Sequence, residues 1–138
     1  NFLAYKNVDL FKPNLKEIKE GLNIDKDLTT TEGVTEAIAL MHEQLMNKVS
    51  MVTMSERGVL VSTADQQYHT KAHIRNISDV SGAGDTVISI AACCLATDCS
   101  LKQLSELSNL GGGLVCEEKG VVPISKERLI SEAERIGL

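Results

Sequence analysis

A glycine-rich turn followed directly by an apolar run limits most strongly how this chain can fold. Residues 79–85 read Asp-Val-Ser-Gly-Ala-Gly-Asp, and residues 86–92 continue as an apolar, helix-like run. The two glycines that flank Ala83 allow a sharp backbone turn that exposes amide N–H groups. A helix that starts there adds unsatisfied N–H donors and the positive end of its dipole. The turn therefore predicts a site for an anion, such as a phosphoryl group, at the start of a helix.

Asp85 brings a negative charge into this turn. A site built only to bind phosphate should not carry a carboxylate, so Asp85 suggests a general base that takes a proton from an attacking hydroxyl. The alternative is a plain glycine turn in which Asp85 is a helix-start residue. The string by itself does not decide between these two interpretations.

The composition of the chain limits the kinds of molecule that it is expected to bind. The chain has 138 residues, enough for one domain with a core, and its net charge of -5 comes from 14 basic and 19 acidic residues. The chain lacks a dense Lys/Arg stripe and has few aromatic residues. Both features argue against nucleic acid or an anionic membrane surface as the main partner. We find no secretory signal and no apolar run of membrane-spanning length, so we expect a cytoplasmic protein. The start at Asn1 rather than Met suggests a piece of a longer protein.

The cysteines and histidines do not form a metal-binding pattern. No Cys-x-x-Cys pair occurs among Cys93, Cys94, Cys99 and Cys116, so we expect buried, reduced thiols rather than disulfides or zinc ligands. The three histidines are too scattered for a metal site, and His42 is expected to be solvated on the polar side of its helix.

Helical and strand patterns alternate along the chain, which predicts an α/β fold. The predicted helices cover residues 14–22, 32–47, the run after the turn to Ala96, a stretch capped by Ser100, and 125–136. The predicted strands cover residues 49–54, 58–62, 68–74 and 121–122. Because the first two strands are close enough for a hairpin, we expect a mixed sheet.

Two helices have apolar stripes that predict which residues are buried. In the helix over residues 32–47 the inner face would consist of Val34, Ile38, Met41 and Leu45. In the terminal helix the residues expected to face inward are Leu129, Ile130 and Ala133.

Two short strings lie where ligands bind in α/β proteins, at the ends of strands. Asn14 and Glu17 are one helical turn apart, a spacing that suits either a capping box or the orientation of a hydrated magnesium ion. Residues 53–58, with Ser55, Glu56 and Gly58, suit either a nucleotide-contacting turn or an ordinary hairpin turn.

A third string places Asn109 beside three consecutive glycines, 111–113, inside a predicted helix. Glycine in a helix costs about 1 kcal/mol relative to alanine, so three in a row need an explanation. Close approach of an adenine ring is one, and tight packing of the helix on the sheet is the other. The chain has neither a Walker A string nor a complete dinucleotide-binding fingerprint.

Together these strings resemble the PfkB/ribokinase family of carbohydrate kinases. Residues 79–86 are similar to the family's C-terminal signature, with Ser81 in place of a frequent Thr. In the run that follows, Ile90 stands where the family usually has a small residue. Asn14-x-x-Glu17 is similar to its Asn-x-x-Glu motif, and residues 53–58 to its nucleotide-contact turn. Within the family, residues 12–18 and 55–58 are most similar to heptose 7-phosphate kinases.

The resemblance implies the C-terminal portion of a ribokinase-like fold, a layered α/β sheet with flanking helices over residues 1–138, and ATP-dependent transfer of a phosphoryl group to a sugar hydroxyl. It implies a catalytic base at Asp85, an anion hole from the amides of Gly82, Ala83 and Gly84, and Mg²⁺ ordered through water by Asn14 and Glu17. It further implies that the nucleotide lies along Ser55, Glu56 and Gly58, with its adenine near Asn109 and Gly112.

The implied reaction converts D-glycero-β-D-manno-heptose 7-phosphate to the 1,7-bisphosphate, a step of ADP-heptose biosynthesis. Two alternatives remain open. The acceptor is another sugar or a nucleoside, or the chain is a nucleotide-binding fragment without activity. The family's N-terminal half, which carries most of the sugar site, is not in this sequence. We therefore expect little kinase activity from the 138 residues alone, and we expect the protein to form a homo-oligomer.

Overall fold

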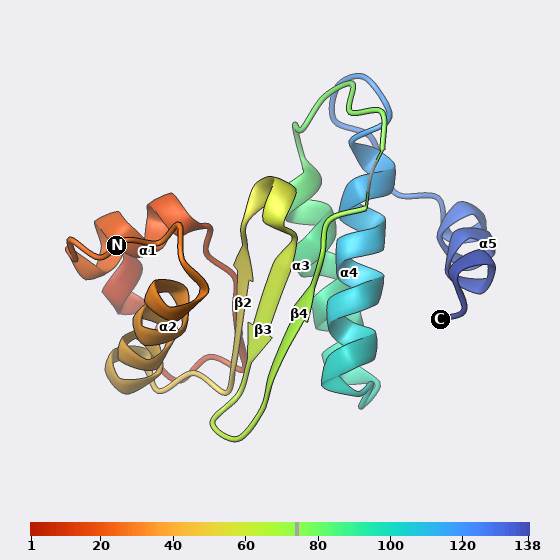
Figure 1. The fold of residues 1–138 in the computed structure, drawn as a ribbon. Helices are drawn as coiled ribbons and strands as arrows, with labels where there is room; N and C mark the ends of the chain where they lie inside the picture. Colours follow the sequence, from red (N-terminus) through yellow and green to blue (C-terminus); the bar gives the residue numbers. More distant parts are fainter. Residues whose placement is uncertain (74) are drawn as a thin grey trace. The chain divides into compact units, whose positions relative to one another are not determined.

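The computed structural model describes residues 1–73 and 75–138, which form two compact units. The first unit contains Asn1–Met54 and Leu60–Gln67, and the second contains Ser55–Val59 and Tyr68–Leu138. Figure 1 shows the helices and strands, with labels for α1 to α5 and β2 to β4.

The described residues contain five α-helices, two short 3₁₀ helices and four strands, and this confirms the predicted α/β fold. The α-helices are α1 (Leu15–Leu22), α2 (Thr31–Leu45), α3 (Ala83–Ala96), α4 (Leu101–Val115) and α5 (Lys126–Ile136), and the 3₁₀ helices are η1 (Phe2–Ala4) and η2 (Ser55–Arg57). The strands are β1 (Leu10–Phe11), β2 (Val49–Thr53), β3 (Val59–Ser62) and β4 (Gln67–Thr70), and the sheet order is β1-β2-β3-β4. β1 and β2 are parallel, with Leu10 opposite Val49 and Phe11 opposite Ser50.

The core of the first unit lies between its two helices and its strands. All four residues predicted for the inner face of α2 are buried: Val34, Ile38, Met41 and Leu45. They pack with Ile18 and Leu22 of α1 and with Val52 and Leu60 of β2 and β3. The apolar stripes at helical spacing therefore identified this core correctly.

The second unit is built around α4. Helix α3 lies beside α4 along much of its length (Figure 1), and α5 packs on α4 through Ala133 against Leu110 and Leu114. Strand β4 is tied to α4 by the Tyr68 hydroxyl, which donates to Glu106 Oε1 at 2.8 Å, and by a 2.7 Å hydroxyl contact between Thr70 and Ser105.

Three predictions of local structure were wrong. The strand expected over residues 68–74 covers Gln67–Thr70, with Lys71–His73 outside it, and Ile74 lies outside the described residues. No strand forms at Val121, which is 75% exposed, because the preceding Gly120 has a φ of +76° and breaks the extended backbone. Ile130 is 47% exposed, because α5 packs through a narrower stripe at Leu129 and Ala133.

Two side-chain expectations also need correction. All four thiols are free, but Cys93 is exposed, whereas Cys94 and Cys116 are buried as expected. His42 is half-buried rather than solvated, with its Nδ1 3.0 Å from the Asn47 carbonyl oxygen. Of the helices in the described ranges, none combines the length and the apolar character needed to cross a membrane.

The cysteines should differ sharply in reactivity. Burial raises the pKa of the Cys94 thiol to about 11, so only about 10⁻³ of it is thiolate at pH 8. We expect iodoacetamide at pH 8 to modify exposed Cys93 first and to leave Cys94 unmodified in the folded protein. Peptide mass spectrometry over time measures this, and labelling in 6 M guanidinium chloride, where all four thiols should react, is the control. Equal rates at both positions in the folded protein would contradict the burial of Cys94.

Candidate functional site

The glycine-rich turn has the geometry of an anion site. Gly82 takes the left-handed conformation, with φ of +77°, directly before α3, and L side chains rarely adopt that conformation. The Ala83 N–H donates to the Val80 carbonyl oxygen at 3.2 Å. Within the described part of the chain, no acceptor lies in hydrogen-bond geometry to the N–H groups of Gly84 and Asp85. Two backbone donors at a helix N-terminus are therefore available to an anion.

Asp85 lies in the first turn of α3 and its side chain is exposed. Its backbone carbonyl accepts a hydrogen bond from the Ser89 hydroxyl at 2.7 Å, one turn further along the helix. Asp85 therefore lies in a regular helical turn that also contains the two available amides, which is compatible with a base next to a bound phosphoryl group.

A second aspartate holds the turn in place. Asp79 Oδ1 accepts the Ser81 N–H at 2.9 Å, and Oδ2 accepts the Gly120 N–H at 3.0 Å. These bonds lower the pKa of the Asp79 carboxyl below its usual value, and the bond from Ser81 contributes most. This role of Asp79 was not predicted from the sequence, although an Asp two residues before a Ser is a recognisable Asx turn.

The predicted nucleotide turn is compact. Ser55 has a φ of +51° and Gly58 a φ of +86° at the two ends of η2, and the Gly58 N–H donates to the Ser55 carbonyl at 3.0 Å. A Cβ on Gly58 would lie 2.0 Å from the Thr70 carbonyl oxygen. Gly58 is therefore needed for the close approach of two backbone segments, whether or not it contacts a nucleotide. Glu56, on η2 between them, is exposed.

Asn109 and Gly112 connect this turn to the glycine-rich turn. The Asn109 side-chain amide donates to the Lys71 carbonyl at 3.0 Å, in the segment that lies against Gly58. A Cβ on Gly112 would lie 2.5 Å from Val87 Cγ2 and 3.9 Å from the Ala83 carbonyl oxygen. The second unit thus brings the predicted nucleotide and anion-hole residues into one continuous set of contacts.

The three glycines of α4 are explained by packing, but not by packing on the sheet. A Cβ on Gly111 would lie 2.1 Å from Ile90 Cδ1 of α3, and one on Gly113 would lie 3.2 Å from Arg75 Cδ. With the contact of Gly112 to Val87, Gly111 and Gly112 let α3 approach α4 closely, and Gly113 leaves room for Arg75. Of the two explanations that the sequence left open, the packing that is seen involves a helix and one arginine in place of the sheet.

Asn14 and Glu17 belong to the first unit and form a complete capping box. Asn14 Oδ1 accepts the Glu17 N–H at 2.8 Å, and Glu17 Oε2 accepts the Asn14 N–H at 2.8 Å. The box uses one oxygen of each side chain and leaves Glu17 Oε1 for another partner. This fits a contact to the water shell of Mg²⁺, since Mg²⁺ keeps several of its waters in protein sites.

Comparison with known proteins decides the family. Residues 3–128 match the pfkB family of carbohydrate kinases. This chain belongs to that family.

Its curated relatives include bifunctional proteins named HldE. The pfkB-family chain is 34% identical over 131 residues to HldE of Shewanella sediminis, covering 94% of this chain and 27% of that protein. It is 33% identical over 138 residues to HldE of Pseudomonas syringae pv. syringae, covering 98% of this chain and 28% of that protein. The chain therefore spans little more than a quarter of the length of these relatives.

Solved structures show the fold of this pfkB-family chain. Phosphofructokinase-2 from Escherichia coli superimposes with a TM-score of 0.86 at 21% identity, over 99% of this chain and 43% of that one. Ribokinase from Thermotoga maritima superimposes with a TM-score of 0.81 at 19% identity, over 97% of this chain and 45% of that one. The predicted ribokinase-like fold is confirmed.

Proposed function

We propose that residues 1–138 form the C-terminal part of an ATP-dependent carbohydrate kinase, with the nucleotide side of the site and the catalytic base. The observation that carries the proposal is the turn at the start of α3. There, the available N–H groups of Gly84 and Asp85 stand beside an exposed carboxylate. The membership of the chain in a carbohydrate kinase family supports this assignment.

In this proposal the turn performs two tasks. The Ala83 N–H, expected in the anion hole, already donates to Val80, so the available N–H groups of Gly84 and Asp85 bind the negative charge that develops on the transferring phosphoryl group. The Asp85 carboxylate accepts the proton of the sugar hydroxyl that attacks this group. Proton acceptor and anion site lie within one helical turn, so a hydroxyl beside the bound phosphoryl group would be within reach of both.

In this proposal the nucleotide lies along Ser55, Glu56 and Gly58, with its adenine near Asn109 and Gly112. Asn14 and Glu17 would order Mg²⁺ through its waters. When bound, the metal neutralises charge on the phosphates. Because the capping box holds both side chains on α1, they would be oriented before the metal arrives.

For the acceptor we propose D-glycero-β-D-manno-heptose 7-phosphate. Support comes from the similarity of residues 12–18 and 55–58 to heptose 7-phosphate kinases and from the relatives named HldE. Turnover of the full-length protein with ATP would be measured by ADP release for this heptose phosphate, fructose 6-phosphate and ribose. Formation of a second phosphate ester would be followed by ³¹P NMR.

We expect the heptose phosphate to have the highest kcat/KM and to give the 1,7-bisphosphate. A faster reaction with another sugar would overturn the acceptor assignment and leave the kinase assignment standing. If no acceptor releases ADP, the kinase assignment is wrong. Calorimetric titration with ATP would then show whether the chain binds a nucleotide without catalysis.

A further inference from the structure

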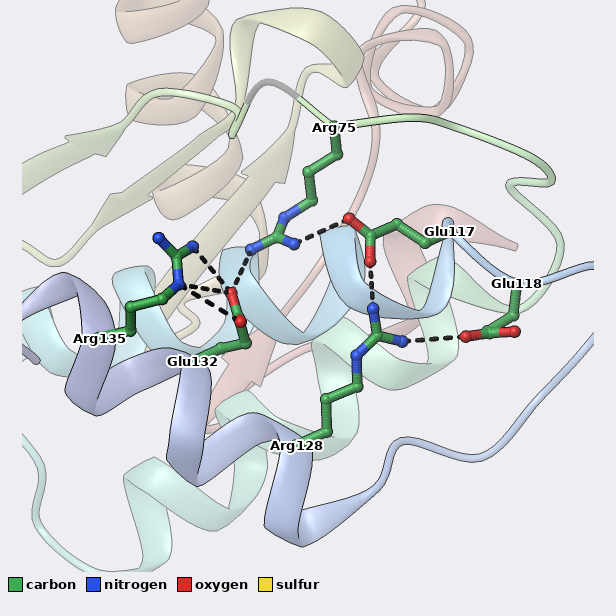
Figure 2. A network of polar contacts seen from close by, with 6 residues as sticks. All are labelled: Arg75, Glu117, Glu118, Arg128, Glu132 and Arg135. Atoms are coloured by element: carbon green, nitrogen blue, oxygen red, sulfur yellow. Dashed lines mark hydrogen bonds and ion pairs between the residues drawn. The ribbon is translucent and has the colours of Figure 1, made fainter.

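Six charged side chains form a network on the second unit (Figure 2). At its centre Arg75, only 10% exposed, pairs through Nη1 with Glu117 at 2.9 Å and through Nη2 with Glu132 at 3.4 Å. Its side chain crosses α4 at Gly113, where a Cβ would be 3.2 Å from Arg75 Cδ. Glu117 follows the end of α4 and Glu132 belongs to α5, so a single guanidinium joins three parts of the unit.

Each of the two central carboxylates has a second arginine. Arg128 pairs with Glu117 and, at 3.0 Å, with Glu118, and Arg135 pairs with Glu132 at 2.9 Å. Arg135 is 64% exposed, and exposed pairs contribute little to stability. The buried Arg75 differs, because a buried charge must be paired and its partners fix its position closely.

The network lies at one end of the segment that leads to the glycine-rich turn. Within described residues 75–81 no helix or strand holds the chain. Further along the segment, the N–H groups of Ser78 and Asp79 donate to the Cys116 carbonyl at 2.8 and 3.2 Å. Cys116 immediately precedes Glu117, so both anchors attach the segment to the same end of α4.

We propose that Arg75 is a positioning residue for phosphoryl transfer: by pairing with Glu117 and Glu132 it sets the path of residues 75–81 and thereby places the amides and the carboxylate of the Gly82–Asp85 turn. The inference rests on the proposed kinase function. Reacting groups must be held in near-attack geometry, and a displacement of about 1 Å costs on the order of 100-fold in rate. The bonds of Ser78 and Asp79 hold the downstream half of the segment, and the ion pairs of Arg75 hold its upstream end.

Arg75→Met in the full-length protein tests this inference. Methionine keeps an unbranched stem over Gly113 and removes the guanidinium, while Glu117 and Glu132 keep Arg128 and Arg135 as partners. We expect kcat, per folded molecule, to fall by about 10- to 100-fold. The KM for ATP should change by less than about 3-fold, because the nucleotide contacts are kept. Arg75→Lys, whose single ammonium keeps the charge but loses the two-pronged geometry, should recover part of kcat.

Arg135→Met is the matched control, since it removes an arginine from the same network without touching Arg75 or Glu117. Its kcat should stay within about 2-fold of the unmodified protein. An active parent whose kcat is unchanged by Arg75→Met would overturn the inference and leave the proposed function standing. If the parent itself is inactive, the proposed function fails, and hydrogen exchange of the hydrogen-bonded Ser81 and Ala83 amides decides the inference separately. Faster exchange in Arg75→Met than in Arg135→Met supports it, and equal exchange overturns it.

Discussion

Replacing Asp85 by Asn in the full-length protein should lower kcat for sugar phosphorylation by on the order of 100-fold or more, the usual contribution of a general base. That loss corresponds to about 2.7 kcal/mol of transition-state stabilisation. Asparagine has the same shape but cannot accept the proton of the sugar hydroxyl. Because the Asp85 side chain is exposed in the first turn of α3, the protein should remain folded. Steady-state kinetics with a thermal melt of the same sample measures both.

Asp65→Asn is the control for this experiment. Asp65 is also exposed, between β3 and β4, and its replacement removes one negative charge without touching α3. Its kcat should be unchanged. If Asp85→Asn behaves in the same way, Asp85 is only a helix-start residue, and the base must be sought elsewhere.

Gly58→Ala should lower the free energy of unfolding by about 2–5 kcal/mol, as the sum of two costs. A non-glycine residue at φ of +86° costs about 1–2 kcal/mol. In addition, the new Cβ would lie 2.0 Å from the Thr70 carbonyl oxygen and 2.6 Å from the Ala72 nitrogen. Backbone atoms cannot move aside as a side-chain tip can, and overpacking of this kind costs about 1–3 kcal/mol. Urea denaturation measures the loss.

Gly120→Ala separates the two costs. Gly120 has a φ of +76°, but nothing lies within 4 Å of the position of its Cβ. Its replacement should therefore cost only about 1–2 kcal/mol, the conformational part. Equal losses for the two variants would contradict the close approach of Gly58 to residues 70–72. ATP affinity of Gly58→Ala, measured on the folded fraction, would then show whether this turn also contacts the nucleotide.

Features set by neighbouring residues could be predicted from the sequence. The caps at Asn14 and Ser100 formed as expected, because a side-chain oxygen before a helix satisfies an N–H two or three residues later. The buried face of α2 followed from the spacing of its apolar residues. The turn at Gly82 followed in the same way, because the left-handed conformation that it requires is open to glycine without steric cost.

Errors arose where distant parts of the chain compete for the same residues. Val121 and Val122 have the composition of a strand, but the neighbouring Gly120 N–H is held by Asp79 in a loop. Ile130 continues an apolar stripe, but α5 contacts α4 through Leu129 and Ala133 and leaves Ile130 exposed. Propensity and periodicity describe one segment at a time, and they do not say which side of it a partner will cover.

The α/β class, the helix that begins at the glycine-rich turn and the residue types that suit phosphoryl transfer depend on residues a few positions apart, so they could be predicted from the sequence. The contacts that hold that turn became visible only in the folded chain. Asp79 binds Gly120, 41 residues away, and Arg75 binds Glu117, 42 residues away. No local pattern encodes such pairs. They form because α3 and α5 each pack against α4, and that packing brings the guanidinium of Arg75 and the amide of Gly120 within reach of their partners.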